Sequence, residues 1–129
     1  MTGVQTCALP IFFEAAVSFY VDVLGARLRW KIHAFNAWVA CVQLSREGPP
    51  VLLADHKEPT GPQLVYRVTS LRNVMAELRK RGWKPEGEPF EIPSGPCCSF
   101  RDPAGNQLAI YECIRPQVVA GFDGRIDKP

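Results

Sequence analysis

The stretch FRDPAGNQLAIYE, residues 100–112, combines a tight-turn signal with a strand pattern. Proline, glycine and asparagine in DPAGN are typical of a turn, and LAIYE has the pattern of a half-buried strand. A second strand pattern, VLLAD at residues 51–55, precedes LAIYE at residues 108–112 by 57 positions. A constant spacing between similar segments indicates an internal repeat.

Two predicted helices have the same spacing. Residues 14–25 carry an apolar stripe with helical periodicity, and Gly25 supplies the C-terminal stop. Residues 70–82 repeat this pattern, with Ser70 as the expected N-cap and Gly82 as the stop. Because Gly25 and Gly82 are also 57 positions apart, the sequence predicts an α+β fold of two tandem βαβββ modules.

Two motifs resemble those of the vicinal-oxygen-chelate superfamily, FYVDVLGARL at residues 19–28 and FRDPAGNQLAIYE at residues 100–112. This superfamily includes glyoxalases, extradiol dioxygenases, epimerases and bleomycin-resistance proteins. The resemblance implies the glyoxalase/bleomycin-resistance-like fold, with module 1 at residues 13–58, module 2 at residues 63–115 and a C-terminal tail at residues 116–129. It implies no particular reaction, because one fold supports many functions.

The N-terminal residues need a separate interpretation. TGVQTCALPI, residues 2–11, resembles the in-frame translation of a sequencing adapter, so we interpret residues 1–12 as a foreign stretch. Its short apolar run follows no basic residue, and a secretory signal is therefore not expected. The spacing of 57 maps the predicted strand at residues 63–68 onto residues 6–11, which we expect to fill the first-strand position despite Pro10.

Composition limits the classes of partner. The chain has 129 residues, is 47% hydrophobic and 22% charged, and carries a net charge of +2, as is typical of a soluble globular domain. This small charge predicts no nucleic-acid partner, and the lack of an apolar run of about 18 residues predicts no membrane span. The five cysteines have no C-x-x-C spacing, so we expect thiols and a cytoplasmic location.

The resemblance also implies a divalent metal, held by His, Glu or Gln from the first and last strands of both modules. Carried onto this chain, the four ligand positions fall on Thr6, Leu52, Gln63 and Ala109. Alanine and leucine have no donor atom, and one glutamine is a weak ligand. We therefore expect no metal and no cofactor.

Neighbouring donors are not expected to replace these ligands. Asp55 and Glu112 lie three positions beyond the empty slots, where strand alternation turns them to the other face, and we expect solvated carboxylates there. His33 and His56 lack a ligand spacing, so surface histidines are expected.

A ligand-binding cup is predicted from strand alternation outward from the ligand slots, with Trp38 added beside Tyr111 as an aromatic wall. The predicted binding residues are Trp38, Leu52, Gln63, Val65, Arg67, Gln107, Ala109 and Tyr111. They include no carboxylate, histidine or cysteine, and nothing near an inward-facing Cys98 would make it a thiolate. No catalytic residue is therefore expected.

The sequence favours a metal-free binding protein similar to the bleomycin-resistance branch, which sequesters a small molecule between two protomers and does no chemistry. Arg67 and the pI of 8.3 favour a small aromatic or anionic molecule or drug over cationic bleomycin. The alternative is a diverged glyoxalase-like lyase or extradiol dioxygenase whose first-strand ligand was lost. A structural or regulatory dimer is a third possibility, and whether modules pair within one chain or swap between two stays open.

Overall fold

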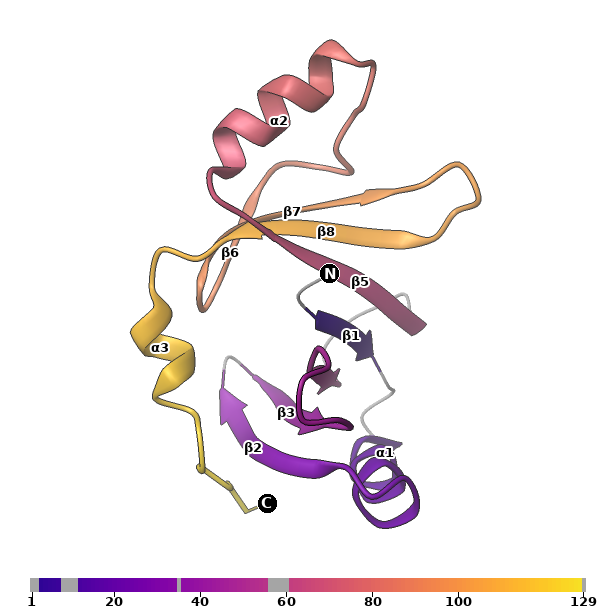
Figure 1. Cartoon of the computed structure of the whole chain (residues 1–129), viewed down its shortest axis with the longest axis vertical. Coiled ribbons are helices and arrows are strands. Elements are labelled where there is room, and N and C mark those ends of the chain that lie inside the picture. Colours follow the sequence, from indigo (N-terminus) through magenta and orange to yellow (C-terminus); the bar gives the residue numbers. More distant parts are fainter. Residues whose placement is uncertain (1–2, 8–11, 35, 56–60, 129) are drawn as a thin grey trace. The chain divides into compact units, whose positions relative to one another are not determined.

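The structure is a computed structural model that describes residues 3–7, 12–34, 36–55 and 61–128. It divides into two compact units (Figure 1). The first unit comprises the described residues up to Pro62 together with residues 122–128, and the second unit comprises Gln63–Gly121. No helix of the described residues is long and apolar enough to cross a membrane.

The first unit is a sheet with one helical segment on it. Its strands lie in the order β2-β3-β4-β1, with bounds β1 Gly3–Cys7, β2 Arg27–Ala34, β3 Ala37–Gln43 and β4 Val51–Ala54. Helix α1 (Phe13–Ser18) continues directly into a π-helix, η2 (Phe19–Val23), so the predicted helix has two parts. Strand β1 runs parallel to β4, and the other neighbours are antiparallel.

The second unit repeats this arrangement. Its strands lie in the order β5-β8-β7-β6, with bounds β5 Gly61–Val68, β6 Phe90–Ile92, β7 Gly95–Arg101 and β8 Gln107–Glu112. Helix α2 (Leu71–Lys80) lies between β5 and β6 in the chain, and α3 (Pro116–Ala120) follows β8. Strand β5 runs parallel to β8, as β1 does to β4.

The predicted α+β fold class is confirmed, and the repeat is visible in the local geometry. Gly25 and Gly82 have φ angles of 73° and 86°, the left-handed conformation that ends a helix and that glycine adopts without strain. The side chain of Ser70 accepts a hydrogen bond from the Asn73 N–H at 3.2 Å, as an N-cap does.

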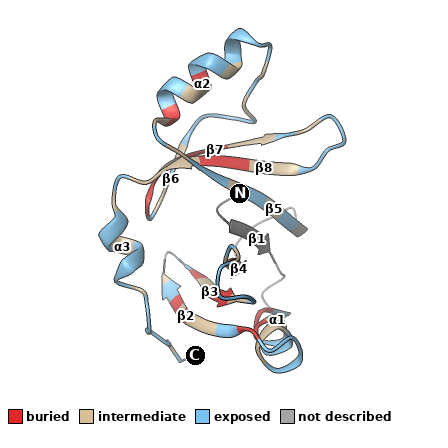
Figure 2. Cartoon of the chain, in the orientation of Figure 1, coloured by how far each residue is buried: buried red, intermediate tan, exposed pale blue. Residues whose placement is uncertain are grey.

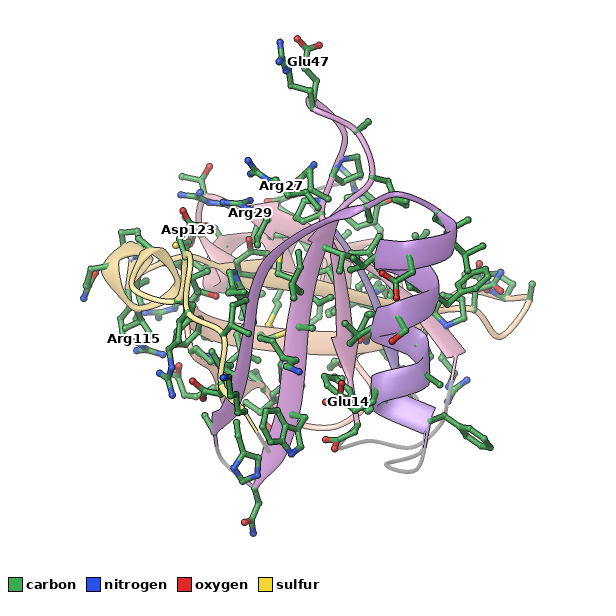
Figure 3. All side chains as sticks on the ribbon, turned by 90° about the horizontal axis from the view of Figure 1, so that it is seen from below. Glu14, Arg27, Arg29, Glu47, Arg115 and Asp123 are labelled. Atoms are coloured by element: carbon green, nitrogen blue, oxygen red, sulfur yellow. The ribbon has the colours of Figure 1, made fainter. Side chains whose placement is uncertain are left out.

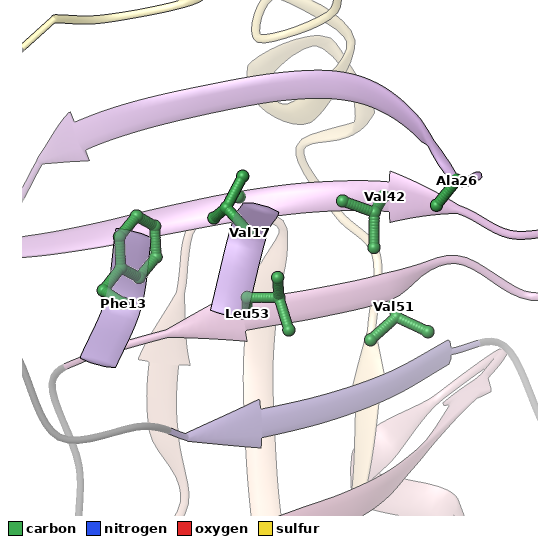
Figure 4. Packing of buried hydrophobic residues seen from close by; sticks show 7 residues of the cluster. Phe13, Val17, Ala26, Val42, Val51 and Leu53 are labelled. Carbon is green, nitrogen blue, oxygen red and sulfur yellow. The ribbon is translucent and has the colours of Figure 1, made fainter. Parts of the chain in front are cut away.

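Each unit has its own core between its helix and its sheet. In the first unit, Phe13 and Val17 of α1 pack on Val42 and Leu53 of the sheet (Figure 4). In the second unit, a similar cluster contains Leu71, Met75, Cys98 and Ile110. Figure 2 shows that the buried positions of α2 are confined to one side of the helix, as an amphipathic stripe requires.

The first strand differs from its prediction in position. It begins at Gly3, earlier than the predicted residue 6, and its described part ends at Cys7, because residues 8–11 lie outside the described residues. In this strand, Gln5 is the Cα partner of Leu52, and Thr6 is the Cα partner of Leu53.

The C-terminal residues pair with β2. The N–H groups of Lys31 and Gly124 donate to the carbonyls of Arg125 and Arg29, both at 2.9 Å. The rings of Trp30 and Phe122 lie 5.2 Å apart. These contacts cover the backbone of a strand that would otherwise form an open edge of the sheet.

The docking of this segment is predicted to weaken in acid. Hydrogen bonds from the Arg125 side chain and the His33 backbone N–H lower the pKa of Asp127 to about 2. Because an unfolded aspartate has a pKa near 3.9, the stabilising effect is complete above about pH 4 and is lost as the pH falls to about 2. The His33 amide resonance, followed by NMR, should therefore shift within this window.

The Asp127→Asn variant is the matched control, because it keeps the size of the side chain and cannot titrate. Its His33 amide resonance should not change between about pH 4 and pH 2. An identical shift in both proteins would show that another group controls the docking.

Candidate functional site

Six of the eight predicted binding residues belong to the second unit and share one face of its sheet. The register pairs Gln63 with Gln107, Val65 with Ala109, and Arg67 with Tyr111. Residues opposite each other in register point to the same side of a sheet. Helix α2 packs on the other side, against Cys98 and Ile110. We call the face formed by these six residues the ligand face.

Burial on the ligand face falls from its centre to its edge. Ala109 is only 2% exposed and is the deepest of the six residues. Val65 and Tyr111 are half-buried, whereas Arg67 is exposed. Arg67 forms no hydrogen bond or ion pair within the described part of the chain. The face therefore has an apolar floor, an aromatic ring and one available guanidinium at its edge.

The side-chain amide nitrogen of Gln63 donates hydrogen bonds to strands β7 and β8 of the sheet. Its Nε2 lies 3.4 Å from both the Ser99 Oγ and the Leu108 carbonyl oxygen. None of the described residues donates to its Oε1. The side chain can therefore accept a hydrogen bond from a ligand without losing these two contacts.

Strand β7 adds two residues that the sequence-based list missed. Cys97 stands opposite Tyr111, and Ser99 stands opposite Ala109, so both belong to the same face. The expectation that Cys98 could point inward is wrong, because Cys98 packs against α2, where burial raises the pKa of its thiol. Counting the antiparallel register back from the DPAGN turn would have identified Cys97.

Leu52 and Trp38 belong to the first unit, on opposite faces of its sheet. Leu52 packs with Trp30 and Cys41 on the face away from α1. Trp38 packs on the α1 side, with its ring 6.2 Å from that of Phe13. The expectation that Trp38 is an aromatic wall on the same face as Leu52 is therefore corrected. Trp38 lies two and four positions before Ala40 and Val42 on β3, so it shares their face, which packs on α1.

Residues 13–110 match the glyoxalase/bleomycin resistance protein/dioxygenase superfamily. The chain belongs to this superfamily. No curated protein sequence matches it significantly.

Solved structures of the same fold are similar over most of the chain. Methylmalonyl-CoA epimerase from Mycobacterium tuberculosis is 18% identical, with a TM-score of 0.68, covering 92% of this chain and 89% of the epimerase. A hypothetical protein from Bacillus halodurans C-125 is 15% identical, with a TM-score of 0.71 and coverages of 89% and 94%. Methylmalonyl-CoA epimerase from Streptomyces coelicolor is 14% identical, with a TM-score of 0.64 and coverages of 89% and 97%. Because these sequence identities are only 14–18%, the structural similarity shows a shared fold and nothing about function.

Two of the positions that the resemblance assigns to metal ligands, Leu52 and Ala109, carry no donor atom. Leu52 lies in an apolar cluster with Trp30, Ile32 and Cys41, and Ala109 is buried without a donor atom. Within the described ranges, no three His, Cys, Asp or Glu side chains come together as a metal site would require.

The nearby carboxylates have structural partners. Asp55 Oδ1 accepts a hydrogen bond from the Trp38 N–H at 2.8 Å. Glu112 Oε1 accepts one from the Leu71 N–H at 2.9 Å, at the N-terminus of α2, where negative charge is favourable. The expectation of merely solvated carboxylates is therefore corrected. His33 is exposed and stacks on Trp38 at 4.8 Å, while His56 lies outside the described residues.

Proposed function

We propose that this member of the superfamily binds a small aromatic acid or a planar anionic molecule without a metal, as a protein that sequesters drugs or related compounds. The observation that carries this proposal is the absence of donor atoms at Leu52 and Ala109. A binding role also agrees with a ligand face whose six residues include no carboxylate or histidine.

The chemistry of the ligand face supports an aromatic acid in particular. Val65 and Ala109 offer apolar contact and Tyr111 offers a ring, in the manner of small-molecule sites with a few placed polar groups. The guanidinium of Arg67 offers a planar fork that matches a carboxylate and can also stack on a ring. The same charge would repel a polycation such as bleomycin.

Two further features are part of the proposal. We propose a homodimer, supported by the exposure of Phe19 at 49% and Val23 at 69% on η2, because exposed apolar side chains often belong to interfaces. We also propose a cytoplasmic location, in keeping with the unpaired thiols of Cys41 and Cys98.

Replacing Arg67 with alanine should weaken the binding of naphthoate, our aromatic acid probe, by about 10- to 150-fold. This range corresponds to about 1.5–3 kcal/mol, typical of a hydrogen bond to a charged group. Arg67→Lys should give an intermediate affinity, because it keeps the charge and loses the fork. Isothermal titration calorimetry with naphthoate measures the affinities of the unmodified, Arg67→Ala and Arg67→Lys proteins.

Arg72→Ala is the matched control, since Arg72 is exposed on α2 and its loss changes the net charge equally. It should bind naphthoate as the unmodified protein does. Equal affinities in the Arg67→Ala and unmodified proteins would refute the assigned ligand face. Turnover of a superfamily substrate that requires added metal would instead support the alternative, a diverged lyase or dioxygenase.

A further inference from the structure

A concave region lies in the first unit, where β2 begins and β3 ends. It has a volume of about 490 Å³. Its lining residues are Gly25, Arg27, Arg29, Gln43, Leu44, Ser45 and Arg46. We call this region the arginine depression. None of its residues belongs to the ligand face, so the inference does not depend on the proposed function.

A β-bulge contributes one of the arginines. In the register of β2 with β3, Leu28 pairs with Val42 and Trp30 pairs with Cys41, which leaves Arg29 as the extra residue. Bulges redirect side chains and recur beside functional sites. Here the bulged Arg29 lines the same depression as Arg27, which precedes it on β2.

Positive charge in the depression is mostly uncompensated. Its lining includes three guanidinium groups and no carboxylate. Asp123 contacts Arg29 at 3.5 Å, a long distance for an ion pair, and its side chain is 61% exposed. Figure 3 shows Arg27 and Arg29 at one end of the unit with Asp123 near Arg29, whereas Glu47 lies at the tip of the β3–β4 loop.

The Arg29 guanidinium retains an unused donor. Its Nε is buried and has no hydrogen-bond partner among the residues the structure describes. Leaving a buried charged donor unsatisfied is unfavourable, and an anion in the depression would relieve this cost.

Ser45 offers a further donor beside the arginines. Its Oγ accepts a hydrogen bond from the Gly48 N–H at 3.0 Å, so the hydroxyl proton is left to donate. The depression thus combines guanidinium forks with a hydroxyl, the donor types that bind phosphoryl oxygens.

We propose that the arginine depression binds the phosphate group of a small phosphorylated molecule. Three positive groups match a dianionic phosphate better than a monoanionic carboxylate, and guanidinium forks bind phosphate through paired hydrogen bonds. The volume of about 490 Å³ leaves room for a small organic group attached to that phosphate. The modest net charge of +2 favours a small ligand over a nucleic acid or a membrane surface.

The test is an NMR titration of the full chain with inorganic phosphate at constant ionic strength. The Arg29 Nε–H and Ser45 amide resonances should shift saturably, and Arg29→Ala should weaken binding about tenfold or more. Arg46→Ala, in the β3–β4 loop, is the second variant in case loss of Arg29 disturbs the bulge, and it should also weaken binding. Arg72→Ala should not change the affinity.

Three results would overturn the assignment. The first is that phosphate leaves the Arg29 and Ser45 resonances unmoved, and the second is that phosphate binds both variants as tightly as the unmodified protein. The third is that acetate binds as tightly as phosphate at equal ionic strength, which would make the depression a general anion site rather than a phosphate site.

Discussion

Replacing Gly95 with alanine is expected to destabilise the second unit by about 3 kcal/mol, the upper part of the usual range for overpacking. A Cβ atom at position 95 would collide with the carbonyl oxygen of Glu112, a backbone atom of β8. The neighbouring Ser94 carbonyl accepts the N–H groups of Ile114 and Arg115, both at 2.9 Å, so these two segments cannot separate easily. Urea denaturation of the unmodified and Gly95→Ala proteins measures the difference in the free energy of unfolding.

Gly105→Ala is the matched control for this substitution. Gly105 has a φ angle of 88°, but an added Cβ would meet no atom within 4 Å. Only the backbone cost of about 1–2 kcal/mol for a left-handed L-residue should remain. If both variants lose the same stability, the collision with Glu112 does not determine the effect.

Leu53→Ala should destabilise the first unit by about 2–5 kcal/mol, as for other large-to-small changes in a packed core. Leu53 is 1% exposed and lies in the cluster of Phe13, Val17 and Val42. Removing its side chain deletes apolar contacts and leaves a cavity between α1 and the sheet. Urea unfolding followed by circular dichroism measures this change.

Leu24→Ala removes the same atoms from the same unit at a position that is 48% exposed. We expect a loss below about 1 kcal/mol, because little apolar surface returns to water. Similar losses at Leu53 and Leu24 would mean that the cluster on α1 is not the core of this unit.

The fold could be predicted from the sequence because its strongest signals are local and occur twice. The glycines that end the two helices and the strands VLLAD and LAIYE share one spacing. Gly25 and Gly82 adopt the left-handed conformation that this pattern predicts. Strand alternation also placed the six residues of the ligand face on one side of β5 and β8.

The errors concern register, which depends on non-local pairing. The resemblance made Thr6 and Leu52 candidate ligands of one site, whereas in the observed register Thr6 pairs with Leu53 and Gln5 pairs with Leu52. A tryptophan can pack on either face of a sheet, so the residue type at position 38 did not reveal that Trp38 packs on Phe13. A single-residue shift reverses the face of every side chain, and only the pairing of strands determines it.

The arginine depression had no sequence signature. A bulge adds one residue to a strand without a change in composition, so nothing in RLRWKIH marks Arg29 as irregular. Arg27 and Arg29 also come together with Ser45 and Arg46 only when β2 and β3 pair.

The most direct test of metal-independent binding is a calorimetric titration of naphthoate into chelator-treated protein, repeated after addition of equimolar Zn²⁺. We expect the same affinity in both samples and no rise in melting temperature with Zn²⁺, because a metal that binds the native state must stabilise it. Naphthoate binding only after Zn²⁺ addition, with a melting-temperature rise that Gln63→Ala abolishes, would contradict the proposed function.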